Sequence, residues 1–126
     1  MKKEILIWIL RIVASVILLQ TLYFKFSAAE ESIYIFNALG VEPYGRVGSG
    51  IAELIVVILI LIPKTTWIGA LTGIGVMSGA ILSHVFVLGL VVKDDGGLLF
   101  SLALITLLCC VGLLYYNKNK LYNFLN

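Results

Sequence analysis

Apolar stretches long enough to cross a lipid bilayer dominate the chain. Of its 126 residues, 61% are hydrophobic and only 13% are charged, whereas a soluble domain is about half apolar and about a quarter charged. A soluble domain of this length would bury only about two-thirds of its surface, so too few polar residues remain to cover the rest. The sequence therefore predicts an integral membrane protein.

The spans are expected to be helices, because hydrocarbon leaves backbone groups no water to bond and the strand-like alternation of polarity is absent. The first stretch is about 30 Å long as a helix and matches the hydrocarbon thickness. The second is the shortest, since Glu53 interrupts it and Pro63 ends it. We expect an all-α membrane protein, a four-helix transmembrane bundle that forms one domain over residues 1–126. Its predicted spans are residues 5–24, 47–62, 67–92 and 98–116.

The flanking charges predict the orientation of these spans. One side of the bilayer receives Lys2, Lys3, Lys64, Lys118 and Lys120, and the other receives Lys25, Arg46 and Lys93 together with five acidic residues. Because cytoplasmic flanks carry the excess of Lys and Arg, both termini are expected on the cytoplasmic side.

Several functions are excluded or disfavoured by composition. The formal net charge of +2 is too small for a nucleic-acid binding face. Cys109 and Cys110 are adjacent inside an apolar run, without a CxxC or a metal-ligand spacing, so we expect buried small side chains and no metal site.

The longest connection, residues 26–46, is predicted to contain a short outer helix. Residues 27–30, Ser-Ala-Ala-Glu, read as a capping box, and Gly40 is expected to end the helix. The helix would lie on the outer bilayer surface or fold over the mouth of the bundle, and the sequence leaves both open. Three apolar side chains fall on one side of it: Ile33, Phe36 and Leu39.

Ionisable residues inside the spans are the candidate site. Each charge there costs about 2.5–3.5 kcal/mol on insertion scales, so each needs compensation. By helix rise Glu53 lies about 9 Å below the outer face and His84 at about the same depth, so the two could meet. Lys25, at the outer end of the first span, has a stem long enough to reach down to them. A buried carboxylate and an imidazole are suited to proton transfer.

A seam of small residues indicates which way His84 faces. Gly69, Gly73, Ala80 and His84 fall within about 60° of one another on a helical projection. Because small residues let transmembrane helices approach closely, this side of the third span is expected to face the interior.

Two arginines and an acidic turn complete the set of candidate polar residues. Arg46 shares a helix face with Glu53, so the carboxylate has either Arg46 or Lys25 as its expected partner. Arg11 lies about 9 Å inside the cytoplasmic end, where it either reaches the lipid head groups or has a buried partner. Asp94 and Asp95 are expected in an acidic turn that complements the dipole of the fourth span.

The chain carries a series of short motifs: Arg11, Lys25-Phe26, Leu39-Gly40-Val41-Glu42-Pro43, Gly48, Glu53-Leu54, Gly69-Ala70, His84 and Asp95-Gly96-Gly97. Their order and spacing along nearly the whole chain resemble the DoxX family of small bacterial membrane proteins. The resemblance implies a four-helix membrane bundle in the bacterial cytoplasmic (inner) membrane, related to the small DoxD subunit of thiosulfate:quinone oxidoreductase. It does not imply one activity.

The leading hypothesis is a redox-associated membrane subunit with an interior polar site for a quinone or a similar lipid-soluble ligand. Glu53 and His84 would exchange protons there. The chain has no flavin, haem or iron–sulfur pattern, so electrons would come from a redox partner protein or a bound cofactor. The alternatives are a non-catalytic scaffold or assembly factor and, less favoured, a small proton-coupled transporter. Gly75 and Gly79 offer a second small-residue face that could serve a homo-oligomer.

Overall fold

The computed structural model describes residues 2–89 and 97–125, and in these residues it contains six α-helices and no strand. Four of the helical segments are long and apolar enough to cross a membrane. A short 3₁₀ turn (Pro63–Thr65) joins α3 to α4, and a π-helical turn (His84–Leu88) extends α4. The α-helices are α1 (Lys2–Phe26), α2 (Glu30–Ala38), α3 (Tyr44–Leu61), α4 (Thr66–Ser83), α5 (Leu98–Tyr116) and α6 (Lys118–Leu125).

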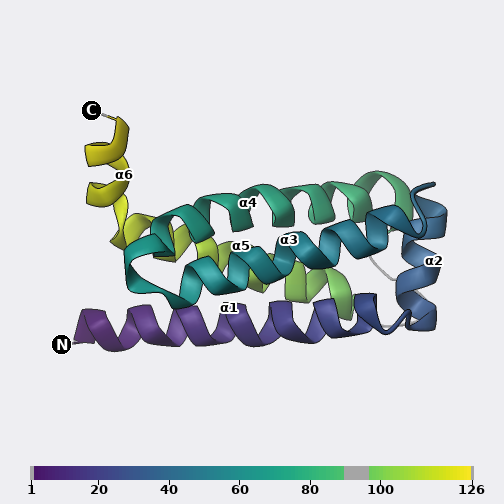
Figure 1. Ribbon diagram of the computed structural model, residues 1–126, viewed down its shortest axis with the longest axis horizontal. Coiled ribbons are helices and arrows are strands. Elements are labelled where there is room, and N and C mark those ends of the chain that lie inside the picture. The colour runs from purple at the N-terminus through teal and green to yellow at the C-terminus, as the bar shows by residue number, and fades with distance from the viewer. Residues whose placement is uncertain (1, 90–96, 126) are drawn as a thin grey trace.

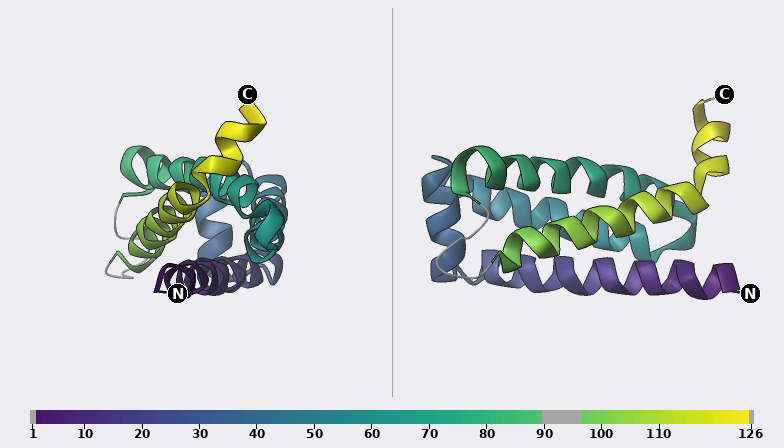
Figure 2. Two further views of the ribbon diagram at one scale, coloured as in Figure 1. Left: turned by 90° about the vertical axis from the view of Figure 1, so that its left-hand side faces the viewer. Right: turned by 180° about the vertical axis from the view of Figure 1, so that it is seen from behind.

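The four long helices lie side by side and alternate in direction (Figure 1). Helix α1 packs on α3 and α5, and α4 packs on the same two helices. The short helix α2 lies across one end of the four, which we call the α2 end (Figure 2). Both chain termini and α6 lie at the opposite end, which we call the terminal end (Figure 2).

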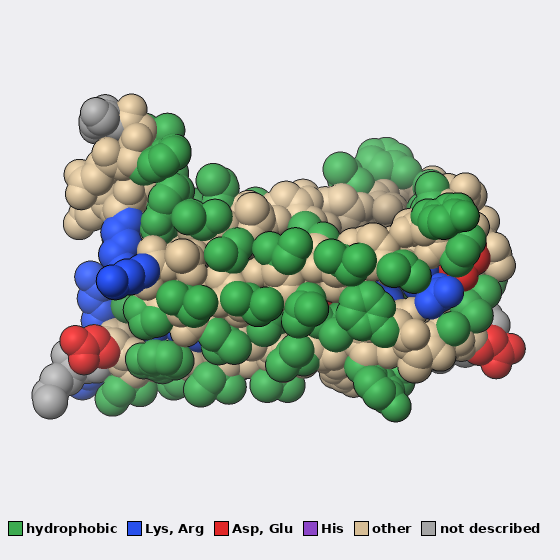
Figure 3. All heavy atoms as spheres, viewed as in Figure 1, with side chains coloured by type: hydrophobic (Ala, Val, Ile, Leu, Met, Phe, Trp, Pro, Cys, Tyr) green, Lys and Arg blue, Asp and Glu red, His purple; other side chains and the backbone are tan. Residues whose placement is uncertain are grey.

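Apolar side chains cover the outside of the long helices, while several polar side chains are inside. Ile5, Ile12 and Val16 of α1 are each more than half exposed, and Figure 3 shows such side chains along the flanks, with Lys and Arg gathered at the terminal end. By contrast, Glu53 and Thr106 are buried to 1% and 0% exposure. This distribution is expected for helices whose sides are solvated by hydrocarbon.

Three of the four predicted spans agree with the helices. The prediction for the other one, residues 67–92, is wrong at its C-terminal end. The fourth coincides with α5, and the first two differ from α1 and α3 by at most three residues at either end. The α-helix of the third span stops at Ser83, a π-helical turn follows, and Gly89 at φ +81° breaks the helical path. The remainder of that predicted span, residues 90–92, lies outside the described residues. Helix α6 was not predicted.

The short helix predicted between the first two spans is confirmed as α2, but its predicted capping box is wrong. Ser27 donates its hydroxyl to the carbonyl oxygen of Phe24 at 3.3 Å, and Ala28 adopts φ +56°. The chain therefore turns sharply before Ala29, the N-cap, which offers no side-chain hydrogen bond. The predicted stop at Gly40 is confirmed, since its φ of +78° is one that glycine tolerates best.

The small-residue seam of α4 faces its neighbours in the interior. A Cβ atom at Gly69 would lie 2.8 Å from the backbone nitrogen of Ile60 in α3, and one at Gly73 would lie 2.7 Å from the Cys110 Sγ in α5. Both cysteines are unpaired and buried, as the sequence predicts. Glycine thus allows α4 to approach both of its neighbours closely.

Candidate functional site

A cavity of about 700 Å³ lies at the α2 end between the long helices. Most of the side chains around it are apolar, and the polar ones include an ion pair, an imidazole and several hydroxyls. Helices α1 to α5 and the π-helical turn all contribute to its wall. Its lining comprises Ile17, Leu18, Thr21, Phe24 and Lys25 of α1, Ala29, Glu30, Glu31, Ser32, Ile35, Phe36 and Leu39 in and beside α2, Ser49 and Glu53 of α3, Val76, Met77, Gly79, Ala80 and Ser83 of α4, His84 and Leu88 of the π turn, and Leu99, Leu102, Ala103 and Thr106 of α5.

Helix α2 folds over this cavity, which decides between the two positions that the sequence left open. Ser32, Ile35 and Phe36 line the cavity, and the Phe36 ring lies 5.7 Å from the Lys25 ammonium. The apolar side of α2 therefore covers the interior site. Of the three side chains predicted to share that side, Phe36 and Leu39 line the cavity and Ile33 does not.

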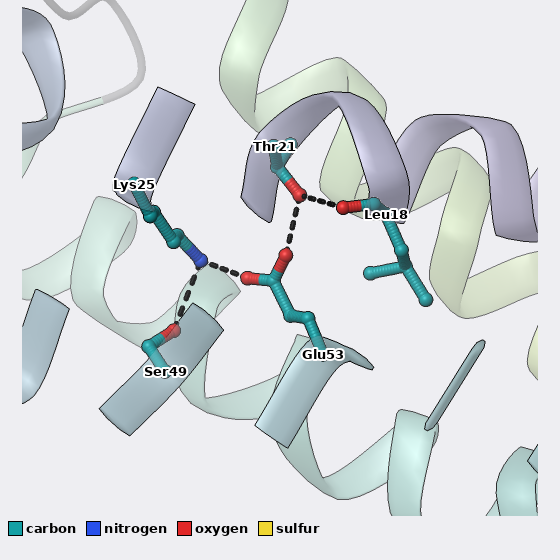
Figure 4. Close-up of polar contacts among 5 residues, drawn as sticks. All are labelled: Leu18, Thr21, Lys25, Ser49 and Glu53. Carbon is teal, nitrogen blue, oxygen red and sulfur yellow. Dashed lines mark hydrogen bonds and ion pairs between the residues drawn. The ribbon is translucent and has the colours of Figure 1, made fainter. Parts of the chain in front are cut away.

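An ion pair between Lys25 and Glu53 joins α1 to α3 on the cavity wall (Figure 4). The side chain of Glu53 is 2% exposed and that of Lys25 is 17% exposed. The ammonium also donates to the Ser49 hydroxyl at 2.9 Å. Each partner offsets the cost of burying the other, and Lys25 rather than Arg46 is the partner of the carboxylate.

The hydroxyl of Thr21 lies between the Glu53 carboxyl and the backbone of α1, where it can donate to either of them. It lies 2.5 Å from Glu53 Oε2 and 2.9 Å from the carbonyl oxygen of Leu18 (Figure 4). A hydroxyl has one hydrogen to donate, so with an ionised Glu53 it donates to Oε2. If Oε2 carries a proton, the carboxyl donates to Thr21, and Thr21 turns its own hydrogen to Leu18.

His84 occupies the first position of the π-helical turn and lines the same cavity. Its Nδ1 lies 3.1 Å from the carbonyl oxygen of Gly89, and its ring meets that of Phe100 edge to face at 5.8 Å. Because a carbonyl only accepts, Nδ1 is the donor in this contact. Among the described residues no hydrogen bond joins this imidazole to Glu53, so a molecule between them would have to connect the two.

Arg46 lies beside the site and contacts Glu42 and the backbone of α1. Its Nε donates to both carboxylate oxygens of Glu42, at 2.9 and 3.1 Å. Its Nη1 donates to the backbone carbonyl of Lys25 near the C-terminus of α1. Since helix C-termini leave carbonyl groups unpaired and carry partial negative charge, Arg46 caps α1 and holds Lys25 in place.

Arg11 is far from the other candidates, toward the terminal end. It is 6% exposed, and its Nε donates to the Thr66 hydroxyl at 3.2 Å. Thr66 in turn bonds the carbonyl oxygens of Ile60 and Ile62. The structure therefore gives Arg11 a buried protein partner. It brings together Lys25, Glu53 and His84 around one cavity and leaves Arg11 out of it.

Two hydroxyl residues of the site, Thr21 and Ser49, are missing from the sequence-based set of ionisable residues. Thr21 is four residues before Lys25, and Ser49 four before Glu53. This spacing places each hydroxyl on the same helix face as the charged residue four positions later, and it could have identified both hydroxyls. Asp94 and Asp95 lie outside the described residues.

No metal centre is evident in residues 2–89 and 97–125, where no three His, Cys, Asp or Glu side chains gather. The site offers instead a carboxylate–ammonium pair and an imidazole beside an apolar space. Among known proteins, no family model, no curated protein and no solved structure matches the chain.

Proposed function

We propose that the protein is a DoxX-like, redox-associated membrane subunit that binds a quinone or a similar lipid-soluble molecule in the cavity under α2. The observation that carries the proposal is the apolar space of about 700 Å³ whose wall holds a buried Lys25–Glu53 pair and the His84 imidazole. An apolar space with a few convergent polar groups is the usual form of a small-molecule site, and its volume falls in the usual range of about 300–1,000 Å³.

The proposed setting is a four-helix bundle in a bacterial cytoplasmic membrane with both termini in the cytoplasm. Two observations support it: both termini lie at one end of the molecule (Figure 2), and Lys and Arg gather at that end (Figure 3). An excess of basic residues marks the cytoplasmic flank. In this orientation the cavity lies toward the outer leaflet, and its apolar lining would suit a ligand that arrives from the hydrocarbon.

The residues present fit a quinone. The Lys25 ammonium has three hydrogens, of which Glu53 and Ser49 take two, so the third can be donated to a carbonyl oxygen. Phe24, Leu102 and Met77 supply apolar surface for a ring and the start of a tail. A bound quinone would supply the redox chemistry that the side chains of the chain lack.

The protein would hold and move protons at two atoms. Glu53 Oε2 can take up a proton and pass the change in hydrogen bonding to Thr21 and Leu18. His84 Nε2 can do the same on the other side of the cavity, with Nδ1 held by Gly89. Such general acid–base roles require groups within hydrogen-bond reach of the ligand. Electrons would pass to or from a partner protein.

The proposal is tested on purified protein by extracting bound lipids and identifying them by mass spectrometry. A quinone recovered in roughly equal amount to the protein is expected. Saturable binding of decylubiquinone, a short-tailed benzoquinone, to protein in lipid nanodiscs is the second readout. If neither co-purifying quinone nor saturable binding is found, the quinone assignment is wrong.

Filling the cavity should abolish this binding. Ala80 lines the cavity from α4, so Ala80→Phe places a ring in the space that the ligand needs. We expect decylubiquinone affinity to fall at least about tenfold, as a clash with a well-fitted ligand demands. Leu71→Phe is the matched control, because Leu71 is 45% exposed on the same helix and does not line the cavity. Equal binding by both variants would place the ligand elsewhere.

A non-catalytic scaffold is the second candidate, and one observation favours it. The Lys25–Glu53 pair and the Arg46 bond to the Lys25 carbonyl both connect α1 to α3. Such contacts could serve only to fix the helices. The scaffold requires no ligand in the cavity, so the same extraction and binding measurements separate it from the leading proposal.

A further inference from the structure

A second polar site lies on α1 toward the terminal end, away from the cavity. Glu4, Ile7, Trp8 and Arg11 line a hollow of about 160 Å³. Glu4, Trp8 and Arg11 are spaced four and three residues apart, so they share one face of the helix. The hollow thus combines an acid, an indole ring and a guanidinium.

The guanidinium of Arg11 is held in a fixed orientation with its outer edge available. Thr66 accepts from Nε at 3.2 Å, and the guanidinium carbon lies 4.6 Å from the Trp8 ring centroid. In the described part of the chain, Ser15 alone has a fully buried side-chain polar atom without a partner. The terminal nitrogens of Arg11 have no protein partner in that part either, so they must keep access to the surface, through the hollow that Arg11 lines.

Glu4 and Arg11 share the hollow without pairing. No ion pair joins them, although pairs within 4.0 Å form elsewhere in the described residues. Their α-carbons are about 10 Å apart along the axis by helix rise. The Arg11 side chain leans toward the helix N-terminus, as side chains on helices do, and so lies over Trp8. Because both side chains line the same hollow, a ligand that enters it can contact both charges.

We propose that this hollow binds the head group of a phosphatidylethanolamine lipid from the leaflet at the terminal end. Arg11 would donate its two terminal N–H groups to the phosphate, which a fixed guanidinium recognises well. The head-group amine lies two carbon atoms beyond the phosphate ester oxygen, a reach of about one helical turn, and would be paired with Glu4. Trp8, 45% exposed, would cover the junction between head group and tails.

The charge pattern distinguishes this lipid from an anionic one. The Lys residues at the terminal end attract any anionic lipid, but phosphatidylglycerol brings no amine to Glu4. Binding that depended on Arg11 alone would not prefer the zwitterionic head group. A preference that requires Glu4 is therefore the specific signature of the proposed site.

The test is native mass spectrometry of the full-length protein in detergent supplemented with equal amounts of dioleoyl phosphatidylethanolamine and dioleoyl phosphatidylglycerol. The wild type is expected to retain the ethanolamine lipid about tenfold more than the glycerol lipid, the difference that one charge-assisted hydrogen bond can supply. Arg11→Gln should reduce retention of both by about tenfold or more. Glu4→Gln should remove the preference while leaving glycerol-lipid retention unchanged.

Glu4→Gln is the decisive variant, because Glu4 is exposed in the first turn of α1 and its replacement leaves the packing intact. Lys64→Gln removes an exposed charge in the turn between α3 and α4, outside both the hollow and the cavity; it is the control and should keep the preference for the ethanolamine lipid. Equal retention of the two lipids by the wild type, or an undiminished preference in Glu4→Gln, would overturn the proposal. Neither result depends on whether the cavity under α2 binds a quinone.

Discussion

Replacing Lys25 with methionine is expected to destabilise the protein by about 3–5 kcal/mol, because it leaves a buried carboxylate without its opposite charge. The Glu53 side chain is 2% exposed, so it cannot recover its hydration without a change in packing. Glu53→Gln should destabilise less, because Lys25 is 17% exposed, keeps Ser49 as a partner and can reach toward the head groups. Unfolding of each variant by SDS in mixed micelles measures the difference.

The double variant Lys25→Met/Glu53→Gln separates stability from ligand binding. Both charges are gone and both side-chain volumes are kept, so most of the stability lost in Lys25→Met should return. Decylubiquinone binding should not return, since the ammonium that would meet the carbonyl oxygen is missing. Losses of stability that simply add in the double variant would show that the two side chains do not interact. Full decylubiquinone binding by the double variant would show that the ion pair does not contribute to the ligand site.

The four long helices could be predicted because the signal for them is local. A run such as residues 98–116 is uniformly apolar and begins after a glycine, Gly97 at φ +84°. Its ends were therefore predicted correctly. The third span was predicted to run past Leu88 because residues up to Val92 are apolar, whereas the helix changes to a π turn at His84 and its path breaks at Gly89. Hydropathy measures where lipid can be tolerated, and it does not report a change in hydrogen-bond register.

The local signals at the helix ends were less reliable. The Ser27–Glu30 pattern fits a capping box, but Ala28 turns the chain into the left-handed region and Ser27 bonds backward to Phe24. Helix α6 escaped prediction because residues 118–125 are neither long nor apolar. It is held by contacts distant in sequence: Lys120 donates to the Pro63 carbonyl at 3.1 Å, and Phe124 packs on the Trp67 ring at 5.3 Å.

The site was partly accessible from the sequence, since charges stand out in apolar runs. Glu53 and His84 could be placed at about one depth by helix rise alone, and the long stem of Lys25 put its ammonium within reach of them. The sequence could not decide whether Lys25 or Arg46 pairs with Glu53, because the answer depends on the hydrogen bonds that Arg46 donates to Glu42. The cavity could not be predicted either. Its volume depends on how far α2 folds over the long helices, which is a property of tertiary packing.

Gly69→Ala is expected to destabilise the protein by about 1–3 kcal/mol, the usual range for overpacking. The new Cβ would lie 2.8 Å from the backbone nitrogen of Ile60 and 2.9 Å from the Cβ of Leu59. Backbone atoms cannot rotate away, so α3 and α4 must separate. Gly75→Ala is the control on the same helix, since a Cβ there meets no atom within 4 Å. It should be neutral or slightly stabilising, as alanine favours helix formation. The same SDS unfolding assay measures both, and equal stabilities would contradict the close packing of α4 on α3.

The two interior glycines of α4 should differ in whether a second substitution rescues them. At Gly73 the nearest atom is a side-chain sulfur, the Cys110 Sγ at 2.7 Å. Cys110→Ala removes that atom, so Gly73→Ala/Cys110→Ala should be more stable than Gly73→Ala alone. No side-chain truncation removes the Ile60 nitrogen, so Gly69→Ala/Ile60→Val should gain nothing over Gly69→Ala. Rescue at Gly69 and none at Gly73 would mean that the interhelical distance is set by side chains on the α3 side and not by its backbone.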